Sequence, residues 1–141
     1  MKSDVGLAVR LWRWTLGRPA KHLVGTESGR TILLTLFIPS VDRDSKPVNQ
    51  AFWKRKALEW LGQTFGGATA YPPGLGVWRD DGRGGRLVFD ETIVIMSYMS
   101  KAAIDANIAN LRGFMTRMGR ETNQGSVAYV LRQEFCEIPI D

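Results

Sequence analysis

The sequence predicts an α+β fold of the ferredoxin-like kind, a βαββαβ sandwich of one antiparallel sheet and two helices. Two observations predict it. Strand-like and helix-like apolar patterns follow one another in that order between residues 31 and 138. The sheet order 4-1-3-2 would place the first and third strands, which are the most apolar, in the centre, and the strand segment that contains Pro72 and Pro73 at an edge.

The first predicted elements are a strand at residues 31–38 and a helix at residues 50–65. The strand is apolar on both faces, so both faces should be buried. Asn49 is the expected N-cap of the helix, and Gly66 is expected to end it. The predicted buried stripe of this helix is Trp53, Ala57, Leu61 and Phe65.

The second half of the chain continues the pattern. An extended segment at 68–79 is followed by a turn rich in Asp and Gly and by a strand at 86–99. Ser100 is the expected cap of a helix at 101–120, and a last strand is predicted at 125–138. The predicted apolar stripe of the second helix is Ile104, Ile108, Leu111, Met115 and Met118.

The chain of 141 residues is expected to form one domain at 31–141, preceded by a basic helical arm and a linker at 1–30. The net charge is +5, and the arm holds six basic residues against two acidic ones, so most of the charge lies there. No apolar run is long enough to span a membrane and no secretion signal is evident, which predicts a cytoplasmic protein. The single Cys136 and the single His22 argue against a disulfide and against Cys- or His-rich metal sites.

The arm is a candidate nucleic-acid site. Arg10, Trp12, Arg13 and Trp14 alternate cations with aromatic rings. Arginine neutralises phosphates and tryptophan stacks on bases. The same pattern also suits an amphipathic helix on an anionic membrane, or a helix that packs its tryptophans onto the sheet.

Three loops are expected to meet at one end of the sheet: the loop after the first strand, the hairpin turn at 80–85 and the turn after the second helix. Their candidate anion-binding residues are Arg43, Arg79, Arg83 and Arg120. Their candidate ligands for a divalent cation are Asp42, Asp44, Asp80 and Asp81. Alternatively, these side chains form a solvated rim of turns and surface ion pairs.

The candidate catalytic groups are Asp80, Asp81 and Glu91. Asp90 and Glu91 are neighbours on a predicted strand, so their side chains point to opposite faces. One of them can be buried, with a shifted pKa that suits an acid or a base, unless it pairs with an arginine near the strand's start. Three aromatic residues either line a small-molecule pocket or belong to the core or an interface: Tyr71, Trp78 and Tyr98.

Three segments resemble small uncharacterised bacterial proteins of ferredoxin-like architecture: residues 67–71 (Gly-Ala-Thr-Ala-Tyr), 76–80 (Gly-Val-Trp-Arg-Asp) and 91–97. The resemblance covers about residues 31–138 and implies the same fold, without an assigned reaction. Some of these relatives are exported lipoproteins. This chain lacks their N-terminal lipid-accepting cysteine, so the resemblance does not imply export.

These features together favour a non-enzymatic binding or assembly module. Helices can cover only one face of the apolar first strand, so a second subunit, a protein partner or the arm is expected to cover the other face. The module would form a homodimer or join a complex through this open face and contact nucleic acid through the arm. No phosphate-binding glycine loop or serine nucleophile elbow is present, and no cofactor is expected.

Two alternatives remain open at this point. The first is a small enzyme that acts on a phosphate- or carboxylate-bearing substrate at the loop end rich in Asp and Arg. The second is a ligand-sensing dimeric domain.

Overall fold

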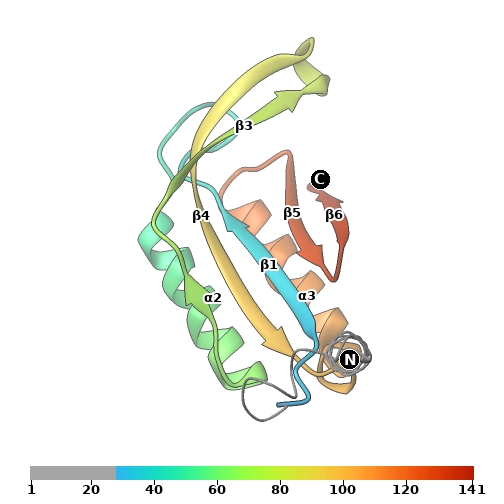
Figure 1. The fold of residues 1–141 in the computed structure, drawn as a ribbon. Helices are drawn as coiled ribbons and strands as arrows, with labels where there is room; N and C mark the ends of the chain where they lie inside the picture. The colour runs from blue at the N-terminus through green and yellow to red at the C-terminus, as the bar shows by residue number, and fades with distance from the viewer. Residues whose placement is uncertain (1–27) are drawn as a thin grey trace, which may run out of the picture.

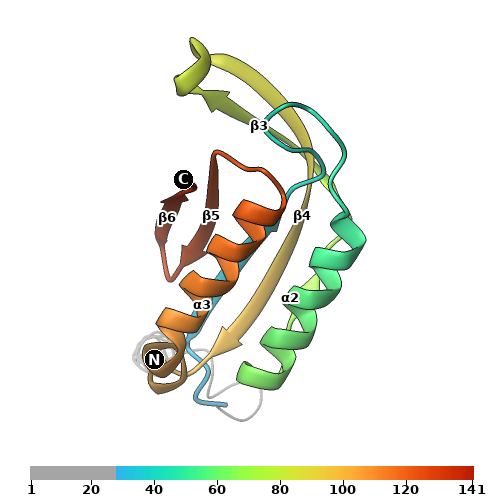
Figure 2. The same ribbon diagram turned by 180° about the vertical axis from the view of Figure 1, so that it is seen from behind.

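The computed structural model describes residues 28–141 and has one antiparallel six-stranded sheet with two helices. Helices α2 (Gln50–Phe65) and α3 (Lys101–Glu121) both lie on the same face of the sheet (Figures 1 and 2). The predicted α+β class is confirmed. The arm residues proposed to bind nucleic acid, Arg10, Trp12, Arg13 and Trp14, lie outside the described residues, so that site stays a prediction.

The strands are β1 (Ile32–Ile38), β2 (Thr69–Ala70), β3 (Gly74–Asp80), β4 (Arg86–Met99), β5 (Ser126–Leu131) and β6 (Glu134–Pro139). Their order is β2-β4-β1-β5-β6, and β3 also pairs with β4. Pro72 and Pro73 separate β2 from β3, because a proline cannot donate to a strand ladder.

The prediction of a single last strand at 125–138 was wrong, because this segment is the hairpin β5–β6. Leu131 pairs with Glu134, which leaves only two residues for the turn. Arg132 takes a positive φ of 62° there, a conformation that usually selects glycine or asparagine. No glycine, asparagine or proline marks this turn in the sequence, so the prediction ran the two strands together. Because the predicted segment at 68–79 is also divided, into β2 and β3, the sheet has six strands where four were predicted.

Both helices begin where their capping residues predict, and α2 also ends where its predicted glycine lies. The Asn49 side chain accepts a hydrogen bond of 3.1 Å from the Phe52 backbone N–H, and Ser100 accepts one of 3.1 Å from Ala103. Gly66 ends α2 with a φ of 91°. One predicted core residue was misplaced: Ile108 of α3 is 37% exposed, whereas the rest of its stripe is buried.

The core lies between the sheet and the helices. Leu34, Leu36 and Ile38 of β1 point into it and are fully buried. The alternate side chains of β1, including Phe37, point to the opposite side and are only half-buried. We call this side, which α2 and α3 do not cover, the open face. The expectation that both faces of β1 are buried thus holds for the helix side alone within residues 28–141.

β3 and the first half of β4 form a two-stranded ribbon that extends past the end of β1 (Figure 1). The pairing register places alternate residues on its two sides. The outer side carries exposed apolar side chains, Leu75, Val77, Leu87 and Phe89. The inner side carries Trp78, Val88 and Asp90, which line a cavity on the open face.

Neither helix has the length and apolar character that a membrane-spanning helix needs.

Candidate functional site on the open face

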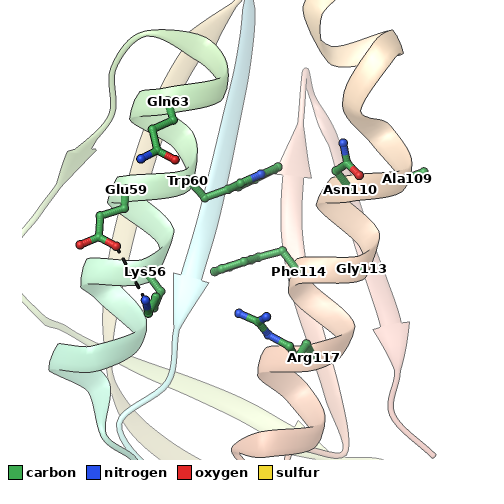
Figure 3. A pocket seen from close by; sticks show the side chains of 9 residues that line it. All are labelled: Lys56, Glu59, Trp60, Gln63, Ala109, Asn110, Gly113, Phe114 and Arg117. Carbon is green, nitrogen blue, oxygen red and sulfur yellow. Dashed lines mark ion pairs between the residues drawn. The ribbon is translucent and has the colours of Figure 1, made fainter.

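A groove of about 430 Å³ lies between α2 and α3. Figure 3 shows Trp60 of α2 and Phe114 of α3 pointing toward one another inside it. Their rings stack with centroids 5.5 Å apart and an angle of 8° between the planes. Both rings also pack against the core, so they already hold the two helices together without any ligand.

The second cavity has a volume of about 540 Å³ and lies on the open face, beneath the β3–β4 ribbon. This is within the range of ~300–1,000 Å³ that is usual for small-molecule sites. Its charged lining residues are Asp42, Arg43, Arg79, Asp80, Asp81, Asp90 and Glu137. The lining thus contains five carboxylates and two guanidinium groups. Its formal charge is −3, which favours a positively charged ligand.

Three aromatic rings from three different strands meet in this cavity: Phe37 of β1, Trp78 of β3 and Phe135 of β6. We call them the aromatic cluster. The Phe37 and Trp78 centroids are 6.2 Å apart, and both lie within 6.5 Å of Phe135. Trp78 is 40% exposed, so its ring is accessible to a flat ligand. Of these three residues the sequence predicted only Trp78 as a pocket residue, because Phe37 lies in a strand expected to be buried on both faces and β6 was not recognised as a separate strand.

The three loops predicted to meet at one end of the sheet are in contact. The Arg83 side chain donates to the Arg43 carbonyl at 2.9 Å and pairs with Asp44 at 3.1 Å. Asn123 Nδ2, from the turn after α3, donates to Asp42 Oδ2 at 3.2 Å and to Asp44 Oδ2 at 3.1 Å. The three loops are therefore held together by contacts of Arg83, Asp44, Asp42 and Asn123.

The predicted site residues divide into two groups. Asp42, Arg43, Arg79, Asp80 and Asp81 line the cavity on the open face. Those that do not line it are Asp44, Arg83, Glu91 and Arg120. Within residues 28–141, no group of three or more Asp, Glu, His or Cys side chains is placed to hold a metal ion.

Asp90 and Glu91 point to opposite faces of β4, as expected for neighbours on a strand, and one of the two side chains is buried. Asp90 is 7% exposed, whereas Glu91 is exposed and points away from the cavity. Asp90 accepts a hydrogen bond of 2.8 Å from the Ser40 backbone N–H, and makes no ion pair with an arginine in residues 28–141. The predicted pocket aromatics Tyr71 and Tyr98 are exposed elsewhere on the surface.

The loop end should lose stability in acid. Hydrogen bonding from Arg83 lowers the pKa of Asp44 below its usual value of 3.8, and the Lys46 backbone N–H does the same for Asp42. A carboxyl whose pKa is depressed by folding stabilises the folded state above its unfolded pKa, and this contribution is lost as the pH falls through the folded pKa. Thermal melts between pH 5 and 2 should show this loss. The double variant D42N/D44N should flatten the curve, and an unchanged curve would contradict this assignment.

No protein-family model and no curated protein matches this chain. Several solved structures do match in fold. One is a phage SAM lyase in complex with S-methyl-5'-thioadenosine, with a TM-score of 0.61 and 16% identity over 82% of this chain and 95% of that chain. Another is a phage SAM lyase in the apo state, with a TM-score of 0.59 and 15% identity over 84% and 96% of the two chains. At such identities the likeness shows a shared fold.

The prediction of a non-enzymatic binding or assembly module is contradicted by this finding, because the shared fold is that of an enzyme. The prediction rested on the absence of known catalytic motifs, and such an absence does not exclude an enzyme. The expectation of a homo-oligomer or protein partner on the open face stays a prediction.

Proposed function

We propose that this chain is an enzyme that cleaves S-adenosylmethionine (SAM) in the cavity of the open face. The observation that carries the proposal is an acidic cavity with an aromatic cluster, on a fold that spans 95% of a SAM lyase chain. No metal or cofactor enters the proposed reaction.

The chemistry of SAM fits the lining of this cavity. SAM has a flat adenine base, a positively charged sulfonium, and an amino-acid tail with an ammonium and a carboxylate. The aromatic cluster offers Trp78 and Phe135 as stacking surfaces for the base. The acidic lining attracts the cationic centres, and Arg43, which also lines the cavity, is available for the tail carboxylate.

If the molecule bound to the structural relative is the product of such a reaction, it indicates which bond the reaction breaks. S-methyl-5'-thioadenosine keeps the methyl and adenosyl groups on sulfur, so the bond that breaks joins sulfur to Cγ of the amino-acid tail. The electron pair of this bond goes to sulfur and turns the sulfonium into a neutral thioether. The tail carboxylate can supply the replacement pair to Cγ, which closes a five-membered lactone. The protein's part is to bind and orient the tail for this ring closure.

We also propose that the sheet is a ferredoxin-like core extended at one edge. The neighbours β5, β1, β4 and β2 stand in the order that a βαββαβ core would give, and β6 adds to β5 as a hairpin. The two helices on one face support this assignment.

The proposal is tested by incubating the full chain with SAM and separating the products by liquid chromatography. S-methyl-5'-thioadenosine should accumulate well above the amount formed in buffer alone, because SAM also decomposes slowly without protein. S-adenosylhomocysteine, whose sulfur is a neutral thioether and a poor leaving group, should stay intact in a parallel incubation. Product formation at the buffer rate by a folded protein would overturn the proposal.

A further inference from the structure

Asp90 is a buried carboxylate in the wall of the open-face cavity. It lies on β4 directly opposite Gly76 of β3, and it is 7% exposed. Gly76 leaves room there, since a Cβ atom at this position would lie 3.3 Å from Thr92 Oγ1 and 3.9 Å from the indole nitrogen of Trp78. The absent side chain thus lets Thr92 come close beside Asp90.

The hydrogen bonds of Asp90 hold its carboxylate in place but leave its charge uncompensated. Oδ1 accepts from the Ser40 backbone N–H at 2.8 Å and also from the Ser40 hydroxyl, and Oδ2 accepts from the Thr92 hydroxyl at 3.3 Å. All three donors are neutral. No lysine or arginine of residues 28–141 forms an ion pair with Asp90.

The two arginines that line the cavity do not form an ion pair with Asp90. Arg79 pairs with Asp81 at 2.6 Å, and Arg43 lies by the backbone at Gly125. A buried carboxylate without a cation is unfavourable for folding, and proteins normally pair such a charge. A ligand in the cavity that carries a positive charge would therefore compensate the charge of the Asp90 carboxylate.

We propose that Asp90 is the specificity-determining residue that selects a positively charged sulfonium nucleoside over the neutral thioether with the same nucleoside. This inference rests on the proposed function of the cavity. Asp90 has three of about four acceptor positions already filled, so it offers mainly charge. A sulfonium has no hydrogen to donate and needs only charge, whereas an ammonium needs free acceptors.

The selection also has a consequence for turnover. Cleavage turns the sulfonium into a thioether, so the attraction to Asp90 ends when the bond breaks. The neutral nucleoside product is then held by the aromatic cluster alone and leaves more readily. Asp90 thus favours substrate over product by charge, without contacting the adenine.

The test compares three ligands with the full-length protein. SAM carries the sulfonium, S-adenosylhomocysteine has the same tail on a neutral sulfur, and S-methyl-5'-thioadenosine has neither the charge nor the tail. Calorimetry at low temperature gives the affinity of each ligand for the wild type, D90N and D105N. D90N keeps an acceptor oxygen for Ser40 and loses only the charge. D105N removes an exposed carboxylate of α3 that pairs with Lys101 and does not line the cavity, and it is the control for a general loss of negative charge.

D90N should weaken SAM binding by about tenfold or more, as expected for the loss of one close charge interaction. It should leave the affinities for the two neutral-sulfur ligands within about twofold, and D90E should restore part of the SAM affinity. An equal loss for SAM and S-adenosylhomocysteine would overturn the inference in favour of ammonium recognition. A loss of the same size in D105N, or no loss in D90N, would overturn it as well.

Two further results separate this inference from the proposed function. A wild type that binds SAM but does not cleave it contradicts the proposed reaction and leaves the comparison of D90N with wild type valid. If D90N does not fold, the affinities of the wild type for SAM and S-adenosylhomocysteine test the inference. A preference of at least about tenfold for SAM over S-adenosylhomocysteine supports the inference, and equal affinities overturn it.

Discussion

Replacing Leu36 by alanine should remove a large part of the stability of this domain. Leu36 lies on the central strand β1, between Ile95 of β4 and Tyr129 of β5, and it is 0% exposed. Truncating a buried leucine costs ~2–5 kcal/mol, because apolar contacts are lost and a cavity remains. A domain of this size is stable by only ~5–15 kcal/mol. Urea unfolding of the purified L36A variant measures the free energy directly.

The control for Leu36 is a leucine of the same size on the outer side of the ribbon. Leu75 is 75% exposed, so L75A should change the free energy of unfolding by less than about 0.5 kcal/mol. Equal losses in L36A and L75A would contradict the assignment of the core. A loss in L75A that depends on protein concentration would instead show that another chain covers the ribbon in solution.

The helices and the central strands could be predicted because several local signals agree there. In α2, the cap at Asn49, the four-residue apolar spacing and the terminal Gly66 all point to the same helix. The β5–β6 turn could not be predicted, because Arg132 adopts a positive φ without any residue that marks it. Pairing with β1 holds this turn, since the Arg132 N–H donates to the Leu33 carbonyl at 3.0 Å. Tertiary contacts thus outweigh local preference at this position.

Only part of the candidate site could be predicted from the sequence. The loop end could be located, because topology alone brings the loops of Asp42, Asp80 and Asn123 together. The aromatic cluster could not be located, because its members lie on three different strands. Placing them on one face requires knowing which residues of β1 face the helices and recognising β6 as a separate strand. Asp90 was considered only as one of two alternatives. Choosing it over Glu91 needs the position of Ser40, fifty residues away in the sequence.

Replacing Trp78 by alanine should strongly weaken SAM binding and cleavage if the aromatic cluster receives the adenine. The indole of Trp78 contacts both other rings of the cluster, with centroids 6.2 Å from Phe37 and 6.4 Å from Phe135. Stacking of a base on an aromatic side chain contributes ~1–3 kcal/mol, which corresponds to an increase in KM of about 5- to 150-fold. Steady-state kinetics with SAM measure this increase. Thermal melts of the same samples show whether the variant is folded.

Two variants distinguish stacking from a general loss of packing. W78F keeps a flat ring and should retain much of the wild-type KM. F52A removes an aromatic side chain that is similarly exposed, at 44%, but lies on α2 against Trp53. It should leave KM unchanged, because the open face is on the other side of the sheet. If F52A raised KM as much as W78A, the adenine would have to bind on the helical side, and the groove at Trp60 and Phe114 would become the site to test.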